Sequence, residues 1–185
     1  MTLKKCNALL TLIMVAALLC HIGAMAITLA TGCFIGGVFW KMMTHIALLC
    51  FVLHVVISII MFFFRHDGRA LSYARLNKKM VLQRVTALLL LILIHTHRHA
   101  YGFILTGTPL TTGGIIFRLI TECLLCGAVM CHIAASFGNA ILTLGLVTSE
   151  KALARIDKVA YSLCAVLLVA AAGSVIIFFT KGLAV

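Results

Sequence analysis

Four histidines stand inside long apolar stretches of the sequence: His21, His54, His97 and His132. Each occupies a different stretch, and the fifth apolar stretch has none. An imidazole within a bilayer has no water to bond, so it needs a specific partner and marks a functional-site candidate. A lone one usually bonds a neighbouring hydroxyl or carbonyl. Four on separate helices favour a shared ligand, because two helices that each present an imidazole can hold a haem iron from both faces. Four histidines allow two haems.

The depths of these histidines can be compared from the helical rise. At about 1.5 Å per residue, His54 lies about 16 Å, His97 about 20 Å and His21 about 24 Å from the basic end of its stretch. His132 is harder to place because its stretch is unusually long. The spacing therefore suggests a stack of two haems and leaves the pairing open.

Three other histidines near these stretches are weaker candidates. His45 precedes His54 by half a turn more than whole helical turns, so the two cannot share a face. His95 and His99 lie two residues either side of His97 and point elsewhere. They suit a haem propionate, a quinone or the membrane interface rather than the iron.

One acidic residue differs in position from the other three. Glu122 is in an apolar stretch, one turn beyond Arg118, whereas the other acids fall in polar segments between stretches. The simplest interpretation is an ion pair between Arg118 and Glu122. The functional alternative is a proton acceptor at a quinone site.

The elements that carry these residues are predicted from hydropathy. The chain is 64% hydrophobic with a mean hydropathy of +1.22, well above a soluble domain. Its continuous apolar runs are long enough to cross a bilayer as helices, and none alternates as a barrel strand does. We expect an all-α integral membrane protein, a single transmembrane domain of five helices near residues 7–30, 41–64, 80–103, 115–146 and 158–179. The first run also resembles a cleavable signal peptide.

The basic residues predict the orientation. Most lie at the N-terminus, in the loop 65–84 or in the loop 149–158, and the other side carries few: Lys41, Arg98, Arg118 and Lys181. This asymmetry places the N-terminus in the cytoplasm and the C-terminus outside. The net charge of +11 is thus a topology signal that favours anionic membrane lipid, not nucleic acid, as the neighbour.

A short motif adds a family resemblance. Ser72-Tyr73-Ala74-Arg75 is followed by Val81-Leu82-Gln83-Arg84-Val85-Thr86, which leads into the third helix. The chain resembles the five-helix, two-haem cytochrome b membrane anchor of succinate:quinone oxidoreductases and fumarate reductases. Counting from the motif, the resemblance assigns the third-helix ligand to His97 and the preceding one to His54. Ser136-Phe137-Gly138-Asn139 after His132 resembles the family's fourth helix, and the hydrophobic pattern matches His21 to the first-helix ligand.

The resemblance implies two haem b groups, one between His54 and His132 nearer the cytoplasm and one between His21 and His97 nearer the outer face. It implies that Arg84 meets a haem propionate or a quinone. A flavoprotein subunit with FAD and an iron–sulfur subunit would dock on the cytoplasmic side of the cell inner membrane, and a dimer of such complexes is an expected assembly. Electrons would pass between menaquinone and those subunits, which hold the dicarboxylate site, so no catalytic residue for that reaction is expected here.

Two departures and two rival interpretations remain. Some fumarate reductases have a glutamate two residues before the fourth-helix ligand, where this chain has Met130, and an acid after the first helix, where it has none. Glu122 is then the outer-side acid left for a quinone. The rivals are the di-haem anchor of another membrane dehydrogenase, such as a hydrogenase or formate dehydrogenase, and a haem-free membrane transport or binding protein that uses its histidines for metal or protons.

Overall fold

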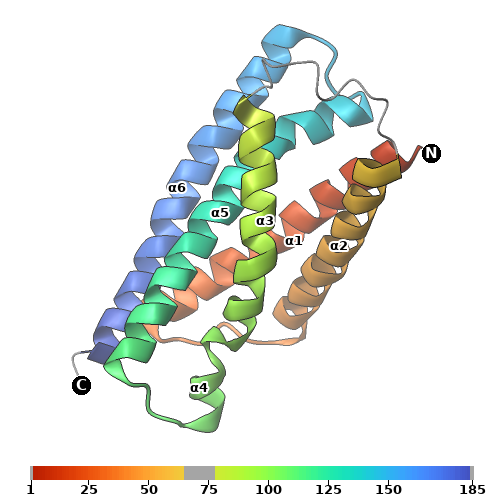
Figure 1. Cartoon of the computed structure of the whole chain (residues 1–185). Coiled ribbons are helices and arrows are strands. Elements are labelled where there is room, and N and C mark those ends of the chain that lie inside the picture. The colour runs from red at the N-terminus through yellow and green to blue at the C-terminus, as the bar shows by residue number, and fades with distance from the viewer. Residues whose placement is uncertain (1, 65–77, 184–185) are drawn as a thin grey trace.

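The described part of the chain is mostly helical. The computed structural model describes residues 2–64 and 78–183, and these form six helices (Figure 1): α1 (Leu3–Thr31), α2 (Val38–Phe64), α3 (Lys78–Ala100), α4 (Gly102–Thr106), α5 (Thr112–Leu144) and α6 (Glu150–Leu183). Five spans are long and apolar enough to cross a membrane, and the third of them, Lys78–Ile104, runs from α3 into the start of α4. The predicted all-α bundle of five transmembrane helices is confirmed, and the chain is a multi-pass membrane protein. The Ser72–Arg75 motif lies outside the described residues.

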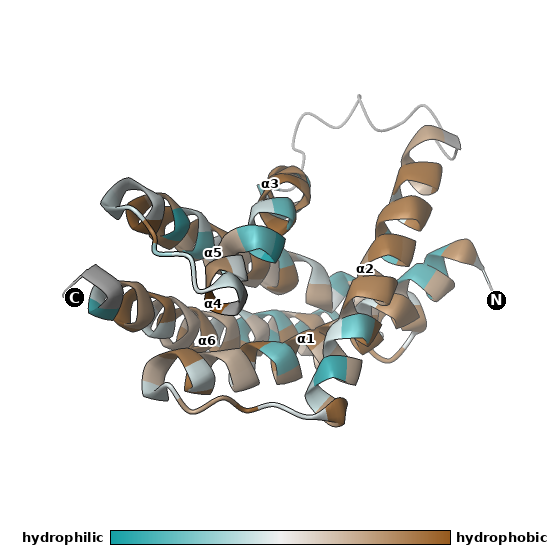
Figure 2. Ribbon diagram, turned by 90° about the horizontal axis from the view of Figure 1, so that it is seen from below, coloured by the Kyte–Doolittle hydropathy of each residue, from teal (hydrophilic) through white to brown (hydrophobic). Residues whose placement is uncertain are grey.

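The central helix of the bundle is α5. It packs against α6, α3 and α1, and α1 also packs against α6 and α2. Among the described elements, the backbone of α2 packs only against α1, and Figure 2 shows α2 standing away from the other helices at one edge. The bundle therefore contains two helix pairs, α1 with α2 and α3 with α5, which meet where α1 crosses α5.

Small residues let the helices approach α5. Its buried residues include Ala128, Ala134, Ala135 and Gly138. Small residues at an interface let helix backbones approach closely, and the resulting van der Waals packing drives association when hydrocarbon surrounds the bundle. Where α1, α5 and α6 meet, larger side chains fill the core: Val15, Met130, Ile133 and Cys164. Outward-facing residues such as Val166 and Val169 are exposed, as a lipid-facing surface requires.

Capping residues set the ends of the last two long helices. Thr111 accepts a hydrogen bond from the amide of Gly114 and starts α5, and Gly145 ends it with a left-handed backbone (φ 77°). The Oγ of Ser149 accepts from the amide of Ala152, so α6 begins at Glu150. The prediction of a loop over 149–158 was wrong, because the polar start of α6 is helical and extends the helix beyond its apolar run.

The predicted third helix is interrupted before residue 103. α3 ends at Ala100, and Tyr101 departs from helical geometry before α4 begins. Arg118 donates through Nη1 to the carbonyls of both His99 and Ala100. A cation at these open carbonyls satisfies the end of α3. Arg118 of α5 therefore caps the C-terminal end of α3.

A polar contact at the other end of the bundle connects three helices. Lys79 of α3 forms an ion pair with Oδ2 of Asp157 on α6 (2.7 Å). The other carboxylate oxygen, Oδ1, lies against the Cα of Gly138 on α5, where any Cβ would meet it. Because Gly138 has no side chain, Asp157 of α6 has room to pass over α5 and reach Lys79 of α3.

Gly138→Ala is expected to destabilise the protein, because the new methyl collides with a carboxylate that the ion pair holds. Overpacking of this kind costs about 1 to 3 kcal/mol. Gly127→Ala is the matched control on the same helix, since no atom approaches a Cβ at that position. Thermal unfolding in detergent, followed by circular dichroism, should show a lower midpoint for G138A alone; equal midpoints would contradict this packing.

Candidate functional site

The pair α1/α2 holds two of the four histidines by hydrogen bonds between its helices. Nδ1 of His54 on α2 lies 3.2 Å from Oγ1 of Thr11 on α1. Nδ1 of His21 on α1 lies 3.1 Å from Oγ1 of Thr44 on α2. Each helix thus contributes one imidazole and one hydroxyl. The two antiparallel helices bind each other's histidines at two levels of the membrane.

The pair α3/α5 repeats this arrangement with different acceptors. Nδ1 of His97 on α3 lies 2.7 Å from Oε2 of Glu122 on α5. Nδ1 of His132 on α5 lies 3.1 Å from both Oγ1 of Thr86 and the backbone oxygen of Gln83 on α3. Again each helix presents one imidazole that its neighbour fixes.

These partners determine where the proton of each imidazole lies. A hydroxyl has one proton to donate, and Thr11 gives its proton to the carbonyl of Asn7 while Thr44 gives its own to the carbonyl of Trp40. A hydroxyl whose proton goes to a carbonyl is left to accept from histidine. The same holds for the carbonyl of Gln83 and the carboxylate of Glu122, which have no proton to give.

With these partners, a neutral imidazole at each of the four positions carries its proton on Nδ1 and leaves a lone pair on Nε2. Every hydrogen bond that these rings make within the described part of the chain uses Nδ1. This is the tautomer in which a metal-binding histidine presents Nε2 while its other nitrogen donates to a supporting group.

Across the two helix pairs, the histidines approach one another, and for His21 and His97 the rings are in contact. The rings of His21 and His97 have centroids 6.2 Å apart and lie nearly perpendicular, at 87°. His54 and His132 are near enough to interact electrostatically. The structure therefore brings together His21 with His97 and His54 with His132. Whether these pairs hold iron stays a prediction.

Glu122 is not bonded to the arginine one turn before it. The predicted ion pair was wrong, because Arg118 turns to the end of α3 and also stacks over Phe103. Glu122 is 2% exposed, and its Oε2 accepts from His97 and from the hydroxyl of Tyr101 (3.4 Å). Its Oε1 has no hydrogen-bond partner in the described chain.

The remaining predicted residues lie around this core. Arg84 is exposed on α3, and its guanidinium lies 5.5 Å from the ring centre of Phe62 on α2. His95 and His99 are exposed and contact each other, so they point away from His97 as predicted. His45 is also exposed, and its Nδ1 meets the carbonyl of Lys41.

The threonines are the functional residues that the sequence analysis missed. Thr11 and Thr86 are buried, and with Thr44 they fix three of the imidazoles. The spacing of polar residues could have indicated one of them. Asn7 and Thr11 are four residues apart on α1, as are His54 and Ser58 on α2. Between the helices, Asn7 bonds Ser58 and Thr11 bonds His54.

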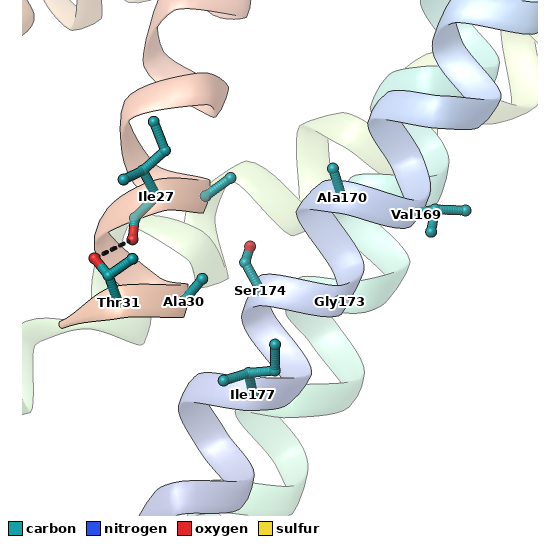
Figure 3. A pocket seen from close by; sticks show the side chains of 9 residues that line it. Ile27, Ala30, Thr31, Val169, Ala170, Gly173, Ser174 and Ile177 are labelled. Atoms are coloured by element: carbon teal, nitrogen blue, oxygen red, sulfur yellow. Dashed lines mark hydrogen bonds between the residues drawn. The ribbon is translucent and has the colours of Figure 1, made fainter.

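Two cavities lie near the C-terminal half of α1. One of about 210 Å³ opens beside His21 and is also lined by Trp40, Lys41 and Thr44. The other, of about 450 Å³, lies between α1 and α6 (Figure 3). Its lining is almost wholly apolar, with Thr31 bonded to the carbonyl of Ile27. None of the four candidate histidines lines this second cavity.

Comparison with known proteins finds no relative: no family model matches the chain, and no curated protein and no solved structure matches it.

Thr11→Val is expected to change the tautomer of His54 in the haem-free protein, because valine leaves Nδ1 without its acceptor. Thr86→Val is the matched control, since His132 keeps the carbonyl of Gln83. Nitrogen-15 NMR of histidine-labelled protein should report Nδ1–H for all four intramembrane imidazoles, and loss of that state only for His54 in T11V. A predominance of Nε2–H in the unaltered protein would contradict the assignment.

Proposed function

We propose that this chain is the di-haem cytochrome b membrane anchor of a succinate:menaquinone oxidoreductase or quinol:fumarate reductase. The observation that supports it most is the set of four intramembrane imidazoles, each bonded through Nδ1, with the rings of His21 and His97 facing each other. Two haem b groups would be held by His54 with His132 and by His21 with His97. When bound, haem iron supplies one-electron transfer between ferric and ferrous states.

The residues present fit such a group. A porphyrin provides four of the six iron ligands, so each site needs only two protein ligands. His21 and His97, whose ring centroids lie 6.2 Å apart, would supply the two imidazole ligands of one site, and His54 and His132 those of the other. Within the described residues, no group of three or more His, Cys, Asp or Glu side chains converges as a metal-ion site.

The protein's own part in electron transfer is to bind, orient and shield. The Nδ1 bonds hold each ring at a fixed angle and proton state. Arg84, at the polar end of α3, is suited to a haem propionate, or to a quinone headgroup, because a guanidinium binds carboxylates and carbonyl oxygens. The surrounding apolar helices keep water from the ligands, which raises the energetic weight of every charge near them.

Glu122 is the residue we propose at the quinone end of the chain. Quinol oxidation releases protons with its electrons, and a buried carboxylate with one unbonded oxygen can accept one. Its neighbour His97 belongs to the pair assigned nearer the outer face, so a proton acceptor there would lie beside an electron acceptor. The protein would reside in the cell inner membrane, with FAD and iron–sulfur clusters on cytoplasmic partner subunits.

The haem content tests the core of this proposal. A reduced-minus-oxidised spectrum with haem quantitation should show two b-type haems per chain. His97→Ala is expected to remove one of them, because it deletes a ligand. His99→Ala, the matched control on the same helix, should leave both, since His99 is exposed and faces away.

Three outcomes would contradict it. Absence of haem from the purified unaltered protein excludes both cytochrome interpretations and favours the haem-free alternative. One haem per chain excludes the two-pair assignment. Loss of a haem in H99A but not in H97A would show that His99, and not His97, is the ligand on α3.

The partner subunits separate the proposal from its nearest rival. Mild-detergent purification through a tag on this chain should yield a complex that contains flavin and oxidises succinate or reduces fumarate with an artificial redox dye. The chain alone should show neither activity. Recovery of a two-haem chain with hydrogenase or formate dehydrogenase activity instead would assign it to the rival class of dehydrogenase.

A further inference from the structure

The four imidazoles do not have equivalent supports. His21 and His54 donate to hydroxyls, and His132 donates to a hydroxyl and a carbonyl, all of which are neutral. His97 alone among them donates to a carboxylate, at 2.7 Å. One member of the His21/His97 pair is thus fixed by a charge, whereas neither member of the His54/His132 pair is.

The surroundings preserve the strength of that charge. Glu122 is 2% exposed, so water does not screen it. The nearest arginine along its helix, Arg118, donates to the end of α3 instead. In the described chain its hydrogen-bond donors are His97 and the more distant hydroxyl of Tyr101 (3.4 Å). His97 is therefore the main hydrogen-bond donor to this carboxylate.

This contact has a known direction of effect on a metal ligand. A carboxylate that accepts from Nδ1–H draws the proton toward itself and makes the imidazole a stronger electron donor through Nε2. A stronger donor stabilises the more positive ferric iron relative to the ferrous form. Low dielectric surroundings increase the effect.

We propose that Glu122 is a positioning residue that fixes the proton on Nδ1 of His97 and lowers the reduction potential of the iron held by His21 and His97, and of that iron only. This inference rests on the proposed function. A single carboxylate would thereby give the two haem irons of one chain different reduction potentials.

Optical redox titration of the purified protein tests the inference directly. The reduction wave that His97→Ala abolishes identifies the centre in question. Glu122→Gln keeps an oxygen that can accept from Nδ1–H but removes the charge, so this wave should shift upward while the other stays in place. Glu150→Gln, the same change at an exposed position, should move neither wave.

A second variant predicts a shift of opposite sign. Tyr101→Phe deletes the competing donor to Oε2, so the carboxylate acts more strongly on His97 and the same wave should move downward. This variant retains the buried charge and its main hydrogen bond, so it keeps the inference testable even if Glu122→Gln does not fold.

The outcomes distinguish the inference from the function on which it rests. A protein without haem contradicts the proposed function. A two-haem protein in which Glu122→Gln moves neither wave, or moves both equally, overturns the role of Glu122 and leaves the cytochrome assignment standing. An upward shift in Tyr101→Phe also overturns it.

Discussion

The constraint on which the rest of this structure depends is that an imidazole inside hydrocarbon must hydrogen-bond to protein. The chain meets it four times through Nδ1, and each time the partner stands on the adjacent antiparallel helix. Threonine serves well because its own proton returns to a backbone carbonyl one turn earlier, as for Thr11 and Asn7. Only its accepting capacity then remains for the histidine. A bond that satisfies burial thereby also determines which nitrogen stays available.

These contacts also set the register of the helices. Along α1 and α2, Asn7 meets Ser58 and Thr11 meets His54. Sliding one helix by a turn would break such pairs together and leave buried polar groups unpaired, which is costly within a bilayer. On the other side, α5 approaches its neighbours through alanine and glycine, with Gly138 making room for Asp157. The polar contacts specify the alignment, and the small residues permit the distance.

Arg118 and Glu122 show how local spacing and tertiary contact compete. The two are one turn apart, and in an isolated helix an ion pair between them would stabilise the helix by a few tenths of a kcal/mol. In the folded chain each of the two residues has a stronger hydrogen-bond partner on α3. The open carbonyls at the end of α3 attract the guanidinium, and Nδ1 of His97 attracts the carboxylate. Glu122 is buried, so its contact with His97 is stronger than an exposed ion pair would be. The asymmetry between the two histidine pairs follows from this choice.

Much of the architecture could be predicted from the sequence. Continuous apolar runs of sufficient length specify helices that cross a membrane, because only a helix satisfies its own backbone there. The same reasoning singles out His21, His54, His97 and His132, since an ionisable residue in such a run demands a partner. Helical periodicity likewise separates His97 from its exposed neighbours. Hydrophobic periodicity does not predict where a helix ends when its polar turns extend beyond the apolar run, as they do at Glu150.

Only the tertiary structure decided which groups satisfy the histidines and which histidines face each other. Hydropathy specifies that a helix is buried in lipid, but not its rotation or its neighbour, because lipid and apolar side chains are nearly equivalent surroundings. The facing of His21 and His97, and the carboxylate of Glu122 behind His97, depend on how α1, α3 and α5 cross. That crossing is set by contacts between residues far apart in the chain, which no local pattern records.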